Sequence, residues 1–313
     1  MLIDFLWSLQ NPAHRDLAYL LASPSLLDDT MDISVISSAE WWEWFLAAKD
    51  WIAADDRAPA TLNQLVNTQR RHKLGLYAED LFLYYLETAS PYEVIAHDLQ
   101  SFIGTRSIGA FDFLLRSPCG RIEHWEMAIK YFVQYTPSTS WKDFIGPGGT
   151  DSLQRKMNKM LKRQILLGDR PEAQADLQKK GYPLPELKRI VSVGKLFRAH
   201  HQPYVSPIHG APEQPTGSWT HKTTFLQYLS DNPHKRWVIR QHPQWIAPTL
   251  LSYAQDSMSH KEVAHFLHDQ QKYVMLSELK NVEHGWQEQK RWFVMPDSWE
   301  RLDQGQNITD KGK

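Results

Sequence analysis

Residues 108–132, IGAFDFLLRSPCGRIEHWEMAIKYF, decide the fold of this chain. Apolar residues alternate with other residues through 109–116 and again through 121–135, as expected for strands that face a core. The short segment 117–120 between them contains a proline and a glycine, and the glycine can adopt the positive φ that tight turns require. The pattern predicts a β-hairpin with its turn at 117–120.

Three charged residues, Asp112, Glu126 and Lys130, lie inside the predicted strands. A hairpin that closes at 117–120 places residue 112 opposite residue 126. Alternate residues of a strand share one face, so the three charges and His124 gather on one side of the sheet. A register slip of one residue would move Asp112 to the other side. Burying a charge is costly unless it is paired or holds a metal, so the stretch contains either an internal ion pair or a functional site.

These residue types suit a metal-dependent phosphodiesterase. Two carboxylates on adjacent strands are oxygen ligands of the kind that Mg²⁺ takes while it keeps several waters and phosphate oxygens. A nearby lysine can orient the attacking water or stabilise charge on phosphorus. The alternative interpretation is an Asp–Lys or Glu–Lys pair that only neutralises itself.

Composition limits the class of protein. The chain has 313 residues, of which 42% are hydrophobic and 23% charged, as in globular proteins with one large domain or two ordinary ones. Its single cysteine, Cys119, excludes an intramolecular disulfide framework and any multi-cysteine zinc module. No apolar run approaches the length of a membrane span, and the start, MLIDFLWSLQ, has an acid where a signal peptide has bases. We therefore expect a cytoplasmic protein with no membrane partner.

Helical and strand patterns occupy different parts of the chain. We expect helices at about 14–27, 38–53, 59–70 and 74–90, where apolar residues recur at helical spacing between Pro, Asp and Ser breakers. After the hairpin we expect strands at 187–197, 235–241 and 290–295 and a helix near 259–270. This order predicts an α/β fold with a mixed sheet flanked by helices.

A basic helix is predicted at 151–166, after a glycine-rich loop. Asp151 and Gln154 resemble a capping box. The apolar stripe of the helix consists of Leu153, Met157, Met160, Leu161 and Leu166. The other side carries five bases with no acid among them: Arg155, Lys156, Lys159, Lys162 and Arg163. That face suits a phosphate backbone, and the alternative is a solvated helix surface. Residues 1–100 contain 15 acids and 6 bases whereas the remainder contains 21 acids and 29 bases, which also favours a polyanion for the later part.

The order of these motifs resembles the core of the PD-(D/E)XK phosphodiesterase superfamily. A helix that carries an acid, LGLYAEDLFLYYL at 74–86, is followed by GAFDFLL, a turn and HWEMAIKYF. The phrases GPGGTDSLQRKMNKMLKRQ, IVSVGKLF and WFVMPDSW extend a closer resemblance, over most of 70–300, to a bacterial domain of unknown function that is associated with this superfamily.

The resemblance implies a role for individual residues. Asp112 matches the acid of the superfamily motif, with Phe111 in place of its proline, and Lys130 matches the lysine. Glu79 matches the helical acid, and Gln164 matches a polar residue on the second helix that joins the five bases as a candidate nucleic-acid contact. The middle acid departs from the motif, because Ala128 stands at that position and Glu126 lies two residues earlier on the same face.

The resemblance also implies an architecture and an activity. We expect a restriction-endonuclease-like αβββαβ core at 74–198. The remaining parts are a helical N-terminal extension at 1–73, a mixed α/β extension at 199–302 and a flexible tail at 303–313. The expected activity is cleavage of nucleic acid, preferentially DNA, that depends on Mg²⁺ or Mn²⁺. Asp112 and Glu126 would be the metal ligands, Lys130 the water-orienting group and Glu79 a supporting acid. The alternatives are a non-catalytic nucleic-acid-binding or scaffold protein with a degenerate site, and an enzyme that acts on another substrate.

Overall fold

The computed structural model describes residues 1–30, 34–66 and 73–300, so the predicted tail at 303–313 lies outside the described residues. The helices are α1 (Leu2–Ser8), α2 (Pro12–Ala22), α3 (Ser38–Asp55), α4 (Ala60–Val66), α5 (Leu74–Thr88), α6 (Leu153–Lys159), α7 (Pro171–Lys179), α8 (Lys222–Asp231) and α9 (His260–His268). The long strands are β2 (Glu93–Ile103), β3 (Arg106–Arg116), β4 (Ile122–Gln134), β6 (Leu187–Ala199), β7 (Thr216–His221), β8 (Arg236–Arg240), β10 (Val274–Val282) and β11 (Gly285–Met295). Three two-residue strands complete the set: β1 (Ser34–Val35), β5 (Phe144–Ile145) and β9 (Leu250–Leu251). None of these helices is long and apolar enough to cross a membrane, within the part of the chain that the structure describes.

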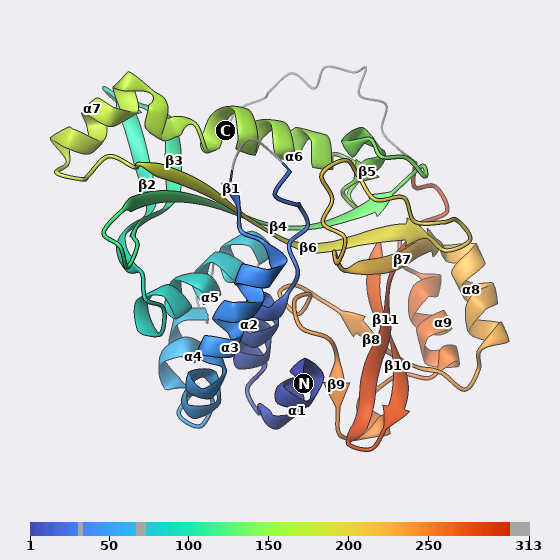
Figure 1. Ribbon diagram of the computed structural model, residues 1–313. Coiled ribbons are helices and arrows are strands. Elements are labelled where there is room, and N and C mark those ends of the chain that lie inside the picture. The colour runs from blue at the N-terminus through green and yellow to red at the C-terminus, as the bar shows by residue number, and fades with distance from the viewer. Residues whose placement is uncertain (31–33, 67–72, 301–313) are drawn as a thin grey trace.

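One mixed sheet runs through the molecule (Figure 1). The order of its strands is β2-β3-β4-β6-β7-β11-β10-β8, with the short strands β5, β1 and β9 at its sides. The neighbours β4 and β6, β6 and β7, and β7 and β11 are parallel, whereas β2-β3-β4 and β11-β10-β8 are antiparallel. The α/β prediction is therefore confirmed, and a parallel centre joins two antiparallel ends.

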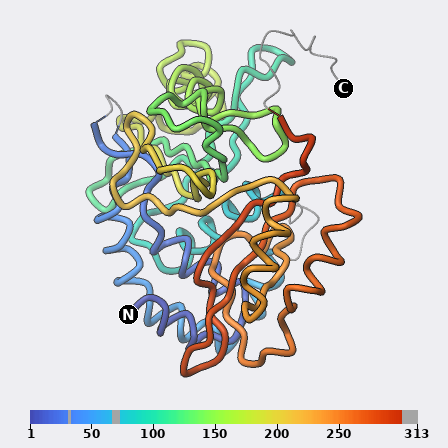
Figure 2. Tube along the Cα trace, turned by 90° about the vertical axis from the view of Figure 1, so that its right-hand side faces the viewer, coloured from blue at the N-terminus to red at the C-terminus, as the bar shows by residue number. Residues whose placement is uncertain are grey.

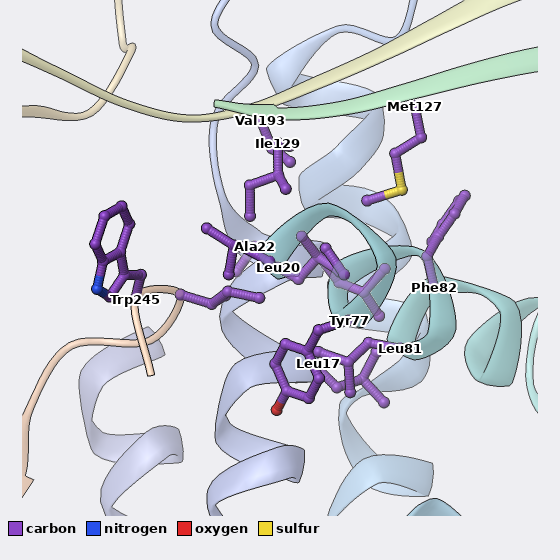
Figure 3. Close-up of a cluster of buried hydrophobic side chains, with 14 of the residues drawn as sticks. Leu17, Leu20, Ala22, Tyr77, Leu81, Phe82, Met127, Ile129, Val193 and Trp245 are labelled. Atoms are coloured by element: carbon purple, nitrogen blue, oxygen red, sulfur yellow. The ribbon is translucent and has the colours of Figure 1, made fainter. Parts of the chain in front are cut away.

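The N-terminal helices pack against one face of this sheet. Figure 3 shows Met127 and Ile129 of β4 and Val193 of β6 pointing toward α2 and α5, where Leu17 and Leu81 lie fully buried. The same buried cluster includes side chains from β7, β10 and β11. Figure 2 shows the N-terminal helices beside these later strands. One core thus connects the first hundred residues with both ends of the sheet.

Helix α6 covers the opposite face of β4. Strand alternation sends odd-numbered β4 residues toward α2 and α5, and even-numbered residues such as Ala128 and Phe132 toward α6. There they contact Leu153 and Met157 of the helix in a second buried cluster. Glu126 has the same parity, so the strand itself places its side chain under α6.

Two details of this helix differ from the sequence prediction. Ser152, not Asp151, is the N-cap, and its hydroxyl accepts a hydrogen bond from Arg155 N at 3.2 Å. The α-helix passes at Met160–Gln164 into a π-helical turn, closed by a bond from Ile165 N to Met160 O of 3.0 Å. A π turn adds about one residue to the turn and so rotates everything after it. For this reason Ile165 is buried, whereas Leu166, which the sequence pattern assigned to the apolar stripe, is exposed.

Candidate functional site

Strands β3 and β4 separate at Asp112. Their ladder runs from Arg116 paired with Ile122 to Phe113 paired with Trp125, which is the predicted hairpin register, and it ends there. Beyond this point β3 continues along β2 while β4 continues along β6. The Oδ2 atom of Asp112 accepts a hydrogen bond of 3.0 Å from Met127 N, so a side chain replaces the backbone partner that β3 no longer supplies. The carboxyl group therefore lies in the fork between the two strands.

Glu126 lies beside Asp112 and is fully buried. Its Oε1 atom lies 3.0 Å from His124 Nε2, and its Oε2 atom accepts a hydrogen bond of 2.7 Å from Gln164 Nε2. The carboxyls of Glu126 and Asp112 are also within hydrogen-bonding reach of each other. Two acidic side chains thus share one site at the fork, Glu126 buried and Asp112 half-buried.

Burial controls the protonation of this pair. It raises the pKa of Asp112 to about 7, and the charge of Glu126 contributes to that rise. Burial also raises the pKa of Glu126 to about 7. It lowers the pKa of His124 to about 4, so the imidazole is neutral at pH 7. Two carboxyls that titrate together near neutral pH hold one negative charge between them more easily than two.

The helix above the fork supplies an ammonium and an amide. The charge of Lys156 lowers the pKa of both carboxyls, and burial in turn lowers the pKa of Lys156. In a regular α-helix, residues 156 and 164 would differ by about 80° around the axis. The π turn at Met160–Gln164 removes most of this difference and brings Gln164 over Glu126. The sequence pattern predicted that Lys156 lies on a nucleic-acid-binding face of the helix. In the structure Lys156 lies close to Asp112 and Glu126 instead.

Lys130 and Glu79 lie at the periphery of the site. Lys130 shares the face of Glu126, but its Nζ atom forms an ion pair with Asp151 Oδ2 at 3.7 Å. Its charge is second to burial in lowering the pKa of Lys156, so the two ammonium groups are neighbours. Glu79, from α5, adds its charge to the burial that raises the pKa of Glu126. The partnership of Lys130 with Asp151 has no local signal in the sequence, because the loop that carries Asp151 is placed by tertiary contacts.

Gly194 fixes the backbone of β4 next to Lys130. The two residues are paired between β4 and β6, and Gly194 has a φ of +140°. A Cβ atom there would lie 1.8 Å from the carbonyl oxygen of Lys130. We expect Gly194→Ala to lower the free energy of unfolding by roughly 2 kcal/mol through backbone strain and displaced pairing. Denaturant unfolding of Gly194→Ala and of Gly148→Ala, where the backbone is not left-handed and a Cβ meets open space, measures the difference; equal losses would contradict it.

A basic groove leads away from the carboxyl pair. It has a volume of about 850 Å³ and lies between the diverging part of β3 and the end of the α6 segment. Its basic lining residues are Arg106, Lys159, Lys162, Arg163 and Arg170. Gln164 lines the same groove and bonds Glu126, so it connects the groove with the acids. Arg155, Lys159 and Lys162 also border a second hollow on the outer side of the helix.

Three side chains at the fork offer oxygen atoms to a cation, and the neutral imidazole of His124 lies beside them. Asp112 and Glu126 contribute carboxylates, and the buried Oε1 atom of Gln164 has no hydrogen-bond partner. This set fits Mg²⁺ or Mn²⁺, which prefer oxygen ligands and retain water. Among the described residues no three His, Cys, Asp or Glu side chains come together as a metal site, so a cation at the fork would need the amide oxygen as its third protein ligand.

Comparison with known proteins gives one result. The family model described as "Domain of unknown function (DUF1853)" matches residues 15–295, which is most of the chain. No curated protein and no solved structure matches the sequence of this chain.

Proposed function

We propose that this chain, which belongs to the DUF1853 family, hydrolyses phosphodiester bonds in nucleic acid, preferentially DNA, in a reaction that depends on Mg²⁺ or Mn²⁺. The observation that carries the proposal is the pair formed by the half-buried Asp112 and the buried Glu126, side by side at a fork of the sheet beside a basic groove. Burying two acids is costly unless something offsets their charge. A divalent cation does so, and the groove supplies the route by which a phosphate backbone reaches it.

Each residue at the fork has a task in this proposal. Asp112, Glu126 and the Oε1 atom of Gln164 would hold the cation, which when bound activates water and offsets charge on the scissile phosphate. His124 is neutral and holds Oε1 of Glu126 in place. Lys156 places a positive charge beside the carboxyls, where it also attracts phosphate oxygens.

The arrangement of α5, β2, β3, β4, α6 and β6 supports a restriction-endonuclease-like core as the finer description of the fold. The helix precedes an antiparallel meander of three strands, and β6 returns parallel to β4 after a crossover that contains α6. In this description Asp112 and Glu126 lie at the centre of the αβββαβ unit. The predicted boundaries at 73 and 198 remain a proposal.

The test is cleavage of labelled single- and double-stranded DNA and RNA by the purified protein with Mg²⁺ or Mn²⁺. We expect cleavage of at least one substrate, with loss of activity on chelation and in Asp112→Asn. Absence of cleavage from all substrates with both metals would contradict the proposal.

The groove makes a separate prediction about binding. Each phosphate contact contributes close to one unit of slope in log affinity against log salt. Replacing Lys159, Lys162 and Arg163 with alanine should therefore weaken binding to all sequences alike and reduce the slope by about two to three units. Fluorescence anisotropy over a range of salt concentrations measures this slope.

The control for this variant has the same change in net charge. The exposed lysines Lys261, Lys272 and Lys280 lie on α9, before β10 and within β10, away from the groove. Their triple alanine variant should bind nucleic acid as the parent does. The same salt-dependence slope in both variants would show that the groove does not contact nucleic acid.

One observation favours a second candidate, a non-catalytic nucleic-acid-binding or scaffold protein. Both oxygens of the fully buried Glu126 are already engaged, by His124 and Gln164, as in a site closed by structural contacts. In that case the basic groove binds nucleic acid with the same salt dependence, but neither Mg²⁺ nor Mn²⁺ stabilises the protein or supports cleavage. The two candidates therefore differ in the cleavage assay and agree in the binding assay.

A further inference from the structure

The basic groove beside the carboxyl pair has two unlike walls. One wall, the helix wall, is the end of the α6 segment, where Lys159, Lys162 and Arg163 line the hollow. The other, the strand wall, is the outer part of β3 with the turn that joins it to β2, and it consists of Ile103 and residues 106–110. Figure 1 shows the α6 segment running toward α7 along the outer ends of these two strands.

The helix wall offers its positive charge to a ligand. Lys159, Lys162 and Arg163 are exposed and form no ion pair with any residue that the structure describes. Asp169, the one acid among the described lining residues, is paired with Lys188. The three cations are therefore available to follow the phosphates of a nucleic acid strand.

Apolar side chains are exposed inside the same groove. Ile103 is 48% exposed at the turn between β2 and β3, and Leu166 is 37% exposed at the end of the helix wall. The π turn in the α6 segment is what turns Leu166 outward. On the strand wall, Gly109 and Ala110 carry no side chain longer than a methyl group, which leaves room beside the two larger residues. The groove thus combines free cations with an open apolar surface.

The carboxyl pair lies too deep for an intact double helix. Glu126 is fully buried and Asp112 is half-buried, and Gln164, which bonds Glu126, forms the boundary between the acids and the groove. The groove volume of about 850 Å³ is that of a pocket which encloses one small ligand. A double helix is much wider and would contact only the rim. A single strand can enter the groove and bring a phosphate to the acids.

The apolar lining also matches a single strand. In a double helix the bases are stacked inside, so the exposed Ile103 and Leu166 would face the charged backbone. The bases of a single strand can turn away from the backbone and lie on side chains of the protein. Cations on one wall and apolar contacts beside them are the combination that such a strand requires.

We propose that the groove between β3 and the α6 segment binds single-stranded nucleic acid, with its phosphates along the helix wall and its bases against Ile103 and Leu166. The inference rests on the proposed hydrolysis for its purpose, and it names the form of the substrate that reaches the carboxyl pair. Duplex DNA then reaches the acids only where its strands separate, so it is cut more slowly than the same strand alone.

Fluorescence anisotropy in the presence of EDTA tests the binding without any need for cleavage. The probes are a labelled single strand of mixed sequence, about 16 nucleotides long, its blunt duplex and a poly-glutamate peptide, all at one salt concentration. Charge alone favours the duplex, because two strands carry more phosphates per unit length than one. We expect the single strand to bind roughly tenfold tighter than the duplex, and the peptide to bind weakest.

A pair of double variants isolates the apolar contacts. Ile103→Ser with Leu166→Ser changes no charge, and it should weaken binding of the single strand roughly tenfold while binding of the duplex stays as in the parent. The control, Ile208→Ser with Leu46→Ser, removes the same residue types at 56% and 37% exposure, and neither residue lines the groove. It should bind every probe as the parent does. Equal or tighter binding of the duplex or the peptide by the parent, or the same losses in both double variants, would overturn the inference.

Cleavage of a duplex that carries a single-stranded overhang separates this inference from the proposed function. With Mg²⁺ or Mn²⁺ we expect the cuts in the overhang. Equal rates of cleavage in the paired part would overturn the inference and leave the hydrolysis standing. Selective binding of the single strand without any cleavage would support the role of the groove and contradict the hydrolysis.

Discussion

Replacing Glu126 with glutamine should reduce Mg²⁺-dependent cleavage of nucleic acid by roughly 10³-fold, since a metal-held phosphate loses several kcal/mol of charge stabilisation when a ligand becomes neutral. The substitution preserves the shape of the side chain and its ability to accept from Gln164. The fold should therefore survive while the activity does not. Cleavage of labelled duplex DNA under single-turnover conditions measures the loss.

The neighbouring Glu123 provides a matched control. It lies on the same strand and is equally buried, but its side chain points to the other face, where it accepts a hydrogen bond of 2.8 Å from Trp125 Nε1. Glu123→Gln should keep cleavage within a few-fold of the parent. Parent-like cleavage by Glu126→Gln, or equal losses in both variants, would show that Glu126 is not a metal ligand.

Asp112→Asn should stabilise the metal-free protein at pH 8, by as much as about 4 kcal/mol. The carboxyl has a pKa of about 7 in the folded protein, against an ordinary value of 3.8 for an aspartate. Between these values the folded state holds a proton that the unfolded state has released, so stability falls as pH rises from about 4 to about 7. Asparagine stays neutral throughout and still accepts from Met127 N. The advantage of the variant should therefore be small near pH 4 and complete at pH 8.

Denaturant unfolding at pH 4.5 and pH 8, with EDTA or with Mg²⁺, measures this effect. Mg²⁺ should stabilise the parent at pH 8 and leave Asp112→Asn unchanged. Asp169→Asn removes an exposed carboxylate paired with Lys188 and should show neither the pH-dependent gain nor a change in the Mg²⁺ response. A structural ion pair between Asp112 and a lysine requires the reverse result, a loss of stability in Asp112→Asn at pH 8.

The hairpin and its register could be predicted from the sequence because the turn fixes both. The segment 117–120 leaves one way to close two alternating strands, and Phe113 opposite Trp125 follows from it. Strand parity then places Glu126 and Lys130 on one face without any further information. The α/β class follows from the same alternation together with the helical N-terminal spacing.

Other features depend on contacts that no local pattern encodes. The π turn after Lys159 has no sequence signal, yet it decides that Gln164 reaches Glu126. Strands β7 and β10 were not predicted, and β7 carries the glycine of TGSWTH within a strand of only six residues. The ammonium of Lys130 was expected at the acids, but Asp151 attracts it from a loop whose position is set by pairing with Gly146. Long-range packing, and not local propensity, determines the π turn, the two unpredicted strands and the position of Lys130.

The most direct measurement of the central claim is a titration with Mn²⁺ followed by electron paramagnetic resonance at pH 8. The account predicts that the parent protein binds one ion per chain, that Mg²⁺ displaces it, and that Asp112→Asn and Glu126→Gln each abolish binding while Glu123→Gln retains it. Unchanged binding in the Asp112 and Glu126 variants, or no binding by the parent, would contradict it.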